Sequence, residues 1–321
     1  MSLMQNQAAI IGCGVIGLTS GIRLLEAGFD VEIIARDLPP DTTSDTAAAI
    51  WYPYRCHPEE KALEWGRKTL QSCDSLATEP GAGVHPVTFT EYLPEPAPDP
   101  WWKDAVKQFR RVNPKELPGM YKDGFRFEVP FVDSSLHMPW LLNRFYKLGG
   151  SIQTREIRDF EEIGSESEII VNCAGLGGGT LASDNTVYPV KGQSVRVKGR
   201  NDGGYYLDQH GELALCYVLP RSADIVLGGT AVEHDFSAEP EDVITSEIIR
   251  KAKLLDPSLQ IDEITDVRAG LRPARPDVRL EEEQKNGRLI IHNYGHGGAG
   301  YTLCWGCADE VVGLVKKTLI E

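Results

Sequence analysis

The chain has 321 residues, enough for two domains of ordinary size, and its 41% hydrophobic and 25% charged residues are typical of a globular protein with a full core. Acidic residues outnumber basic ones by 47 to 33, and the resulting net charge of −14 argues against a nucleic-acid-binding surface. No apolar run approaches the roughly 18 residues of a membrane span, and the N-terminus MSLMQNQ lacks the features of a signal peptide.

The first forty residues predict a dinucleotide-binding unit. An apolar run at 8–12 is followed by GCGVIG, by apolar residues at helical spacing that end at Gly28, and by a β-rich run at 31–35. Strand, glycine turn, helix and strand form the context in which G-x-G-x-x-G binds a pyrophosphate at a helix N-terminus. Gly12 allows a tight turn, Gly14 allows close approach of the pyrophosphate, and Gly17 allows close packing of the helix on the strand.

The end of the second strand departs from the simplest form of this pattern. An acidic residue is expected there to bind the adenosine ribose, but the sequence is Ala35, Arg36, Asp37. Either Asp37 supplies the carboxylate one position later, or Arg36 lies against the adenine or ribose. A lone arginine would also suit the 2′-phosphate of NADP, although the rest of the chain argues against NADP.

The next segments do not continue a regular series of strand–helix units. Residues 41–54, DTTSDTAAAIWYPY, run from hydroxyl groups through small residues to aromatic rings, an order that suits a flat, partly charged ligand. The proline-rich stretch 80–101 cannot be a regular helix. A helical pattern returns at 138–150, and a buried strand at 168–175 ends on glycine.

A second glycine-rich helix start favours FAD over NAD. NYGHGGAG precedes a helix with apolar positions 303, 307, 311, 312 and 315 on one face. One helix N-terminus suits a pyrophosphate, and a second suits the N1–C2=O edge of a flavin, which gains negative charge on reduction. His296 in this turn is expected to fix the loop by a hydrogen bond rather than to catalyse.

Several segments, in order from residue 9 to beyond residue 305, carry a family resemblance: GCGVIGL, ARDLP, TTSDTAAAIWYPY, APDPWWKDAVKQF, VNCAG, YVLPRSADIVLGG, GLRPARPDVRLE and IHNYGHGGAGYTLCWGCA. By these the chain resembles the D-amino-acid oxidase and D-aspartate oxidase group of flavoproteins. The resemblance implies an α/β fold with a Rossmann-like FAD-binding domain built from discontinuous segments, residues 1–50, 133–190 and 265–321. It also implies a substrate-binding domain with a large mixed or antiparallel β-sheet, residues 51–132 and 191–264.

The resemblance also implies a set of residues around a non-covalently bound FAD. They are Gly12, Gly14, Val15, Ile16, Gly17, Arg36, Asp37, Thr42, Thr43, Ser44, Ala48, Ala49, Ile50, Ile157, Ala174, Arg272, Gly297, Gly298, Gly300, Tyr301 and Thr302. The hydroxyl residues would lie near the pyrophosphate and ribityl chain. The small residues after them would let backbone N–H groups reach the flavin ring.

Three residues are implied to contact the substrate in catalysis. Arg272 would bind the substrate carboxylate, because a planar guanidinium matches a carboxylate bidentately. Tyr217 would hydrogen-bond the same carboxylate, and Gly298 would offer its backbone C=O to the substrate amine. The pocket around the side chain would include Ile50, Tyr52 and Leu219. No metal is expected.

The reaction implied is oxidation of a D-amino acid to an imino acid by hydride transfer from Cα to flavin N5, with O2 reduced to H2O2. The imino acid then hydrolyses to a 2-oxo acid and ammonia. The chain departs from mammalian relatives at Leu213, where a lid tyrosine is usual, and at Tyr52, where a glutamine is usual. It lacks the arginine and histidine of acidic-substrate relatives at Ala231 and Tyr54. These changes favour neutral, and among them apolar, D-amino acids, with Arg221 as a cation that would weaken the argument if it points inward.

Other functions stay open at this point. The alternatives are a D-aspartate oxidase, a glycine or sarcosine oxidase, an NAD(P)-linked dehydrogenase and a non-catalytic flavin-binding protein. The seven cysteines are scattered and odd in number, so we expect a reducing, cytoplasmic compartment, with Cys304 and Cys307 packed in the core. A homodimer is compatible with the sequence, and no nucleic acid or membrane partner is expected.

Overall fold

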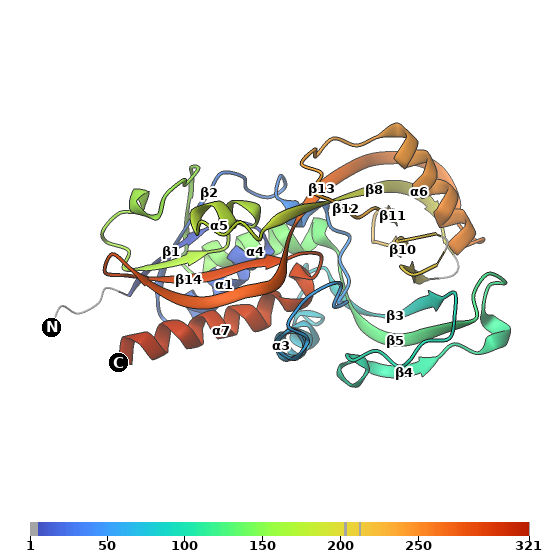
Figure 1. The fold of residues 1–321 in the computed structure, drawn as a ribbon, viewed down its shortest axis with the longest axis horizontal. Coiled ribbons are helices and arrows are strands. Elements are labelled where there is room, and N and C mark those ends of the chain that lie inside the picture. The colour runs from blue at the N-terminus through green and yellow to red at the C-terminus, as the bar shows by residue number, and fades with distance from the viewer. Residues whose placement is uncertain (1–5, 202–203, 212, 321) are drawn as a thin grey trace. The chain divides into compact units, whose positions relative to one another are not determined.

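A computed structural model describes residues 6–201, 204–211 and 213–320 of the protein (Figure 1). The chain forms two compact units, each built from segments that are separated in the sequence. The first unit comprises residues 1–84, 134–189 and 272–321, and the second comprises residues 85–133 and 190–271. Among the described residues, the helices include none that is both long and apolar enough to cross a membrane.

The first unit contains a parallel sheet in the order β6-β2-β1-β7-β14, with β13 antiparallel beside β14. Its strands are β1 (Gln7–Ile11), β2 (Asp30–Ala35), β6 (Ser151–Thr154), β7 (Ile169–Asn172) and β14 (Arg288–His296). The strands β1, β2, β7 and β14 carry few exposed residues, as expected for parallel strands covered on both faces. The long strand β13 (Gln260–Lys285) belongs to the first unit from residue 272 onward.

Helices cover this sheet, and α1 joins β1 to β2 in the way predicted from the glycine pattern. The helices are α1 (Val15–Glu26), α2 (Thr43–Thr46), α3 (Glu59–Leu76), α4 (Ser134–Lys147), α5 (Leu176–Leu181) and α7 (Gly300–Ile320), with a 3₁₀ turn at Phe160–Glu162. Helix α1 ends where predicted, because Gly28 has φ +91° and the N–H of Phe29 reaches back to the carbonyl of Leu24. Helix α7 runs beside β14 (Figure 1).

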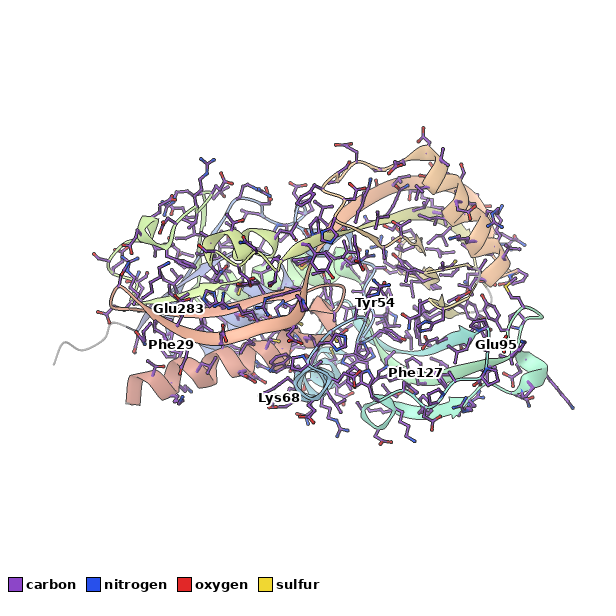
Figure 2. All side chains as sticks on the ribbon, viewed as in Figure 1. Phe29, Tyr54, Lys68, Glu95, Phe127 and Glu283 are labelled. Carbon is purple, nitrogen blue, oxygen red and sulfur yellow. The ribbon has the colours of Figure 1, made fainter. Side chains whose placement is uncertain are left out.

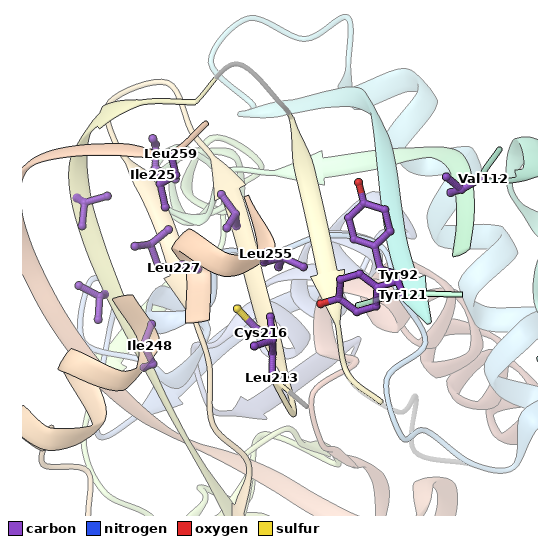
Figure 3. Packing of buried hydrophobic residues seen from close by; sticks show 14 residues of the cluster. Tyr92, Val112, Tyr121, Leu213, Cys216, Ile225, Leu227, Ile248, Leu255 and Leu259 are labelled. Carbon is purple, nitrogen blue, oxygen red and sulfur yellow. The ribbon is translucent and has the colours of Figure 1, made fainter. Parts of the chain in front are cut away.

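The second unit is a mixed sheet in the order β4-β5-β3-β9-β10-β11-β8-β13, with β12 beside β8. Its elements are β3 (Val84–Leu93), β4 (Lys107–Arg111), β5 (Asp123–Val132), β8 (Tyr188–Arg200), β9 (Tyr205–Asp208), β10 (Cys216–Pro220), β11 (Ile225–Gly228), β12 (Val232–Glu233), α6 (Asp242–Leu255) and 3₁₀ turns at Lys103–Ala105 and Pro114–Glu116. The hydrophobic face of α6 packs on this sheet through Ile248, Ala252 and Leu255 (Figure 3). The α/β class and the large mixed sheet are as predicted.

The boundaries of the units correct two parts of the prediction. Residues 51–84 belong to the first unit, because α3 packs on α7 through Trp65 and its neighbours, and the hydroxyl of Thr69 accepts the N–H of Gly306 at 3.2 Å. Residues 265–271 belong to the second unit, where the hydroxyl of Thr265 bonds the carbonyl of Arg196 at 3.2 Å. The roles of the two units in binding FAD and substrate remain predictions.

Candidate active site

The glycine turn between β1 and α1 has no room for side chains at two of its three glycines. Gly12 has φ +109°, and a Cβ atom there would lie 2.5 Å from the carbonyl oxygen of Cys173. A Cβ atom at Gly17 would lie 2.0 Å from the carbonyl oxygen of Gly12. At Gly14 the nearest atom would be Oγ of Ser44, at 3.1 Å, so glycine there keeps the backbone open to a ligand.

The segment 42–46 is held against the N-terminus of α1. The hydroxyl of Ser44 accepts the backbone N–H of Val15 at 2.9 Å. Thr42 caps α2, and its own N–H and hydroxyl both donate to the carboxylate of Asp45, at 3.1 and 2.6 Å. Of the predicted hydroxyl residues, Thr42 is therefore used to build the turn, whereas Thr43 is exposed.

The N-terminus of α7 lies beside that of α1. A Cβ atom on Gly300 would lie 3.7 Å from Cγ1 of Val15, and the hydroxyl of Tyr301 donates to the carbonyl of Ser44 at 2.9 Å. The hydroxyl of Thr302 both accepts the N–H of Tyr52, at 3.0 Å, and donates to its carbonyl, at 2.8 Å. Residues that are far apart in the sequence thus meet at two helix N-termini, which favour negatively charged ligand groups.

Arg272 and Gly298, predicted to contact the substrate, are neighbours in the first unit. A Cβ atom on Gly298 would lie 3.5 Å from Cδ of Arg272 and 2.7 Å from Cδ1 of Tyr54, whose position is labelled in Figure 2. The segment that leads to Tyr54 contains buried Ala48 and Ala49, and Ala49 has φ +41°. Because a left-handed backbone is unusual for alanine, Ala49 marks a forced turn of the kind that is frequent at functional sites.

The remaining predicted cofactor residues lie at the ends of strands in the same unit. Ile157 and Ala174 belong to one apolar cluster with Ile11 and Ile34, at the carboxyl ends of β1 and β2. Arg36 and Asp37 follow β2 and form an exposed ion pair at 2.6 Å, so neither alternative for the ribose contact is decided. Further predicted residues are partly buried, namely Ile16, Ser44, Ile50, Gly297 and Gly300.

The Nε2 atom of His296 does not make the hydrogen bond that was predicted to fix the glycine turn. Its Nε2 is buried without a hydrogen-bond partner among the described residues, and burial lowers the pKa of the ring to about 3. The turn is held by backbone bonds instead, from the N–H of Gly297 to the carbonyl of Pro273 at 2.8 Å and from Ala299 to His296 at 2.9 Å. The imidazole is therefore neutral at physiological pH, and no acid–base role follows from its position.

Tyr217 and Leu219 lie on β10 in the second unit. The ring of Tyr217 leaves no room for a side chain on β11, since a Cβ atom on Gly228 would lie 1.9 Å from Cζ of the ring. Leu219 is buried. Their contacts with a substrate remain predictions.

Leu213 and the cation Arg221 both lie in the second unit. Leu213 is buried in the hydrophobic cluster that includes Ile248 and Leu255 of α6 (Figure 3). Residue 212 of the predicted lid loop lies outside the described residues. Arg221 binds both carboxylate oxygens of Asp224 at 2.6 Å and lies 3.7 Å from Asp133.

Sequence reasoning missed part of the support for this site. The hydroxyl of Ser134, the first residue of α4, donates to the carbonyl of Ala47, and the ring of His137 lies 6.4 Å from that of Tyr301. The N-terminus of α4 thereby holds the alanine segment, residues 47–49, in place through Ala47. The serine pair with which α4 begins was a signal in the sequence for this helix start.

The family described as FAD dependent oxidoreductase matches residues 7–314 of the chain. A D-amino-acid oxidase from Rubrobacter xylanophilus is 43% identical over 98% of this chain and 97% of that protein, and one from Dictyostelium discoideum is 41% identical over 97% and 91%. Among solved structures, glycine oxidase from Geobacillus kaustophilus has the same fold, with a TM-score of 0.79 at 18% identity over 97% of this chain and 94% of that chain. The chain therefore belongs to the D-amino-acid oxidase family of FAD-dependent oxidoreductases.

Proposed function

We propose that the protein oxidises neutral D-amino acids with FAD as cofactor and O2 as electron acceptor. The substrate loses its Cα hydrogen as hydride and one amine proton, which yields an imino acid, and O2 takes up the two electrons and two protons as H2O2. Water then converts the imino acid to a 2-oxo acid and ammonia. The observation that carries this proposal is Arg272 beside Gly298, near the start of α7, in a chain that is 43% identical to a D-amino-acid oxidase.

The residues present fit FAD. The backbone at Gly14 is open where a pyrophosphate would approach, and the N-termini of α1 and α7 meet beside Ser44. Residues 12–17 and 42–44 would hold the pyrophosphate non-covalently, and residues 48–50 and 297–302 would surround the flavin ring. When bound, FAD supplies the hydride acceptor and passes the electrons to O2.

Positioning accounts for most of the proposed catalysis by the protein. The guanidinium of Arg272 would fix the substrate carboxylate, and the carbonyl of Gly298 would accept a hydrogen bond from the amine. With the carboxylate and the amine fixed, a D-amino acid would aim its Cα hydrogen at the hydride acceptor, whereas an L-amino acid would aim its side chain there. Holding reactants in such a geometry can supply roughly 7–11 kcal/mol of the barrier reduction.

A neutral substrate is favoured by the partners of Arg221. Its guanidinium is buried and already neutralised by Asp224, with Asp133 as a second nearby carboxylate. Its Nη1 atom has no hydrogen-bond partner among the described residues, but the charge is already balanced by these acids, and a further carboxylate buried there would lack a cation of its own. Arg221 therefore does not supply the free cation that a D-aspartate oxidase would need.

The proposal is tested by replacing Arg272 with alanine. The purified protein should show flavin absorbance and release H2O2 with D-alanine but not L-alanine. We expect R272A to retain flavin and to lose about 10²–10³-fold in kcat/KM, because removing one partner of a buried charge pair costs about 2–5 kcal/mol. R288Q is the matched control, since Arg288 opens β14 and donates to the carbonyl of Phe160 at 3.0 Å.

Different outcomes point to the competing functions. Full turnover by R272A would contradict the carboxylate assignment. Activity with glycine or sarcosine but not D-alanine would indicate a related amine oxidase, and activity confined to D-aspartate would overturn the argument from Arg221. A colourless protein that needs NAD(P) would contradict the flavin proposal. A cytoplasmic location and a homodimer stay predictions of the sequence.

A further inference from the structure

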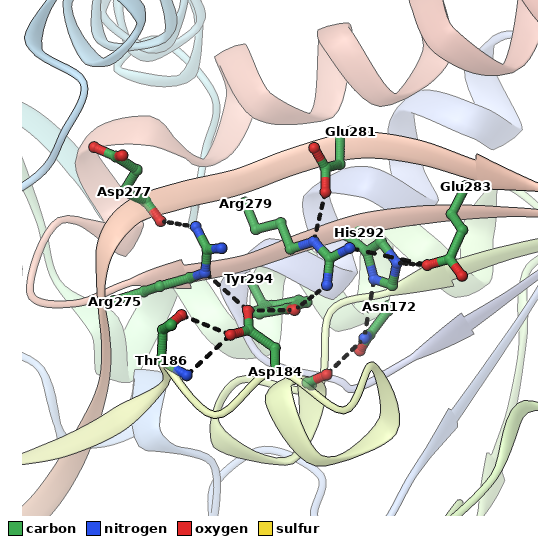
Figure 4. A network of polar contacts seen from close by, with 11 residues as sticks. Asn172, Asp184, Thr186, Arg275, Asp277, Arg279, Glu281, Glu283, His292 and Tyr294 are labelled. Atoms are coloured by element: carbon green, nitrogen blue, oxygen red, sulfur yellow. Dashed lines mark hydrogen bonds and ion pairs between the residues drawn. The ribbon is translucent and has the colours of Figure 1, made fainter.

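The carboxylate of Asp184 accepts four hydrogen bonds although it lies outside the predicted site (Figure 4). Its side chain is 8% exposed, and the residue lies three positions after the end of α5. One oxygen accepts the N–H and the hydroxyl of Thr186, at 3.0 and 2.6 Å. The other accepts Nε of Arg275 at 2.8 Å and the hydroxyl of Tyr294 at 2.9 Å.

Two of these donors, Arg275 and Tyr294, come from the strands that lead to the predicted substrate contacts. Arg275 lies on β13 three residues after Arg272, and Tyr294 lies on β14 four residues before Gly298. Tyr294 is almost fully buried, and its hydroxyl also accepts a bond from Arg279 at 2.8 Å. Asp184 thus joins both strands at a point close to where they deliver their functional groups.

The backbone between these points has little freedom to move. Gly295 has φ +85°, and a Cβ atom there would lie 2.8 Å from Cβ of Arg275. The N–H of Gly297 donates to the carbonyl of Pro273 at 2.8 Å. A shift of Arg275 would therefore be passed to the neighbouring residues on both strands.

We propose that Asp184 is a positioning residue that fixes the guanidinium of Arg272 and the carbonyl of Gly298 through Arg275 and Tyr294. The inference rests on the proposed function, because it takes these two groups as the contacts for the substrate carboxylate and amine. It adds a residue on a different segment, which the predicted site does not contain.

The chemistry of the four bonds explains why a carboxylate is needed. Burial acts to raise the pKa of Asp184, but the bonds from Thr186, Arg275 and Tyr294 outweigh it, and the pKa lies well below the usual range. Asparagine has nearly the same shape, but its NH2 group would face two donors in either orientation. D184N should therefore release either Thr186 or the pair of Arg275 and Tyr294 while changing the volume very little.

The test compares D184N with the wild-type holoenzyme under anaerobic conditions. Mixing with D-alanine and following flavin absorbance gives the Kd of the substrate and the limiting rate of flavin reduction. We expect the Kd to rise about 10- to 100-fold, since small displacements at a site can have effects of this size. The affinity for FAD should stay unchanged. A purely structural role would lower Tm and the affinity for FAD without this selective change in substrate Kd.

E283Q is the matched control. Glu283 is a carboxylate on β13, the strand that carries Arg272 and Arg275, and it accepts a hydrogen bond from Nε2 of His292 at 2.9 Å. It lies farther along the strand from Arg272 than Arg275 does. The substrate Kd of E283Q should equal that of the wild type. If D184N does not fold or loses FAD, Y294F replaces it, since that variant removes one bond to Asp184 and leaves the charges in place. A raised Kd in Y294F supports the inference.

An unchanged Kd in D184N, or in Y294F when D184N fails, overturns the role of Asp184. The proposed function would stand in that case, provided that R272A still loses substrate binding. Retained D-alanine binding in R272A would instead overturn the carboxylate assignment, and the role of Asp184 with it.

Discussion

His137 shows how strongly the surroundings of one residue determine its titration. The ring is 2% exposed, lies 5.7 Å from the ring of Trp140, and has its Nδ1 2.7 Å from the carbonyl oxygen of Ala82. Burial lowers its pKa from 6.5 to about 4, although the bond to Ala82 acts in the opposite direction. The imidazole is therefore neutral in the folded protein when it would already be protonated in the unfolded chain.

The sign of the resulting pH dependence follows from linkage. Between pH 6.5 and about 4 the unfolded chain binds the proton of His137 and the folded chain does not, so the free energy of unfolding falls as the pH falls. His137 should contribute a decrease of about 1.4 kcal/mol per pH unit in this window. Urea unfolding at pH 7 and pH 5 in saturating FAD should show a smaller decrease for H137Q. Parallel curves for the two proteins would contradict this assignment.

At the scale of elements, the packing of α3 on α7 depends on a missing side chain. A Cβ atom on Gly306 would lie 2.2 Å from the carbonyl oxygen and 2.4 Å from Cα of Trp65. These are backbone atoms of another helix, which cannot move aside individually. Gly313 lies on the same helix but is exposed, and a Cβ atom there would contact nothing within 4 Å.

Alanine at these two positions should therefore change stability in opposite directions. G306A should lower the free energy of unfolding by about 1–3 kcal/mol, because added volume forces the helices apart. G313A should raise it by roughly 0.5–1 kcal/mol, because alanine is favoured over glycine inside a helix. Urea denaturation of both variants measures the two effects. Equal and small changes would mean that the contact at Gly306 is not tight.

The contact between α3 and α7 also shows where prediction of the fold from the sequence ends. The first strand, glycine turn and helix are local, so their pattern and the cap at Gly28 were sufficient to predict them. The assignment of residues 51–84 to the first unit depends on the packing of Trp65 against Gly306. These residues are 241 positions apart, and no local pattern indicates their contact. In the proline-rich stretch, β3 was missed because Pro86 near the start of a strand looks like a break.

The predicted site divides in the same way. Glycines and hydroxyl residues stand in recognisable motifs, and the structure brings Val15, Ser44, Gly300 and Tyr301 together. No sequence motif indicates the hydrogen bonds from Arg275 and Tyr294 to Asp184, since these partners lie 91 and 110 positions away from it. Predicting it would require the register of β13 against β14.

For the whole molecule, the first unit is assembled from three segments of the chain that meet where FAD is proposed to bind. Ser44 bonds both Val15 of α1 and Tyr301 of α7, so one ligand along this path would stabilise both contacts at once. A ligand that binds only the folded state adds about 2.7 kcal/mol to stability at a concentration of 100 times its Kd. Removing FAD should therefore lower Tm, and adding it back should restore Tm in a concentration-dependent way.

G17A should abolish this response, because its Cβ atom would lie 2.0 Å from the backbone oxygen of Gly12 and would open the turn that receives the pyrophosphate. G119A is the control, since a Cβ atom there contacts nothing within 4 Å and the residue lies in the second unit. Thermal unfolding of both variants, with and without added FAD, separates loss of the cofactor site from general instability. If Tm of G17A still rises with FAD as in the wild type, the pyrophosphate does not bind at this turn. In that case the second glycine-rich helix start, at α7, would be the place to look for it.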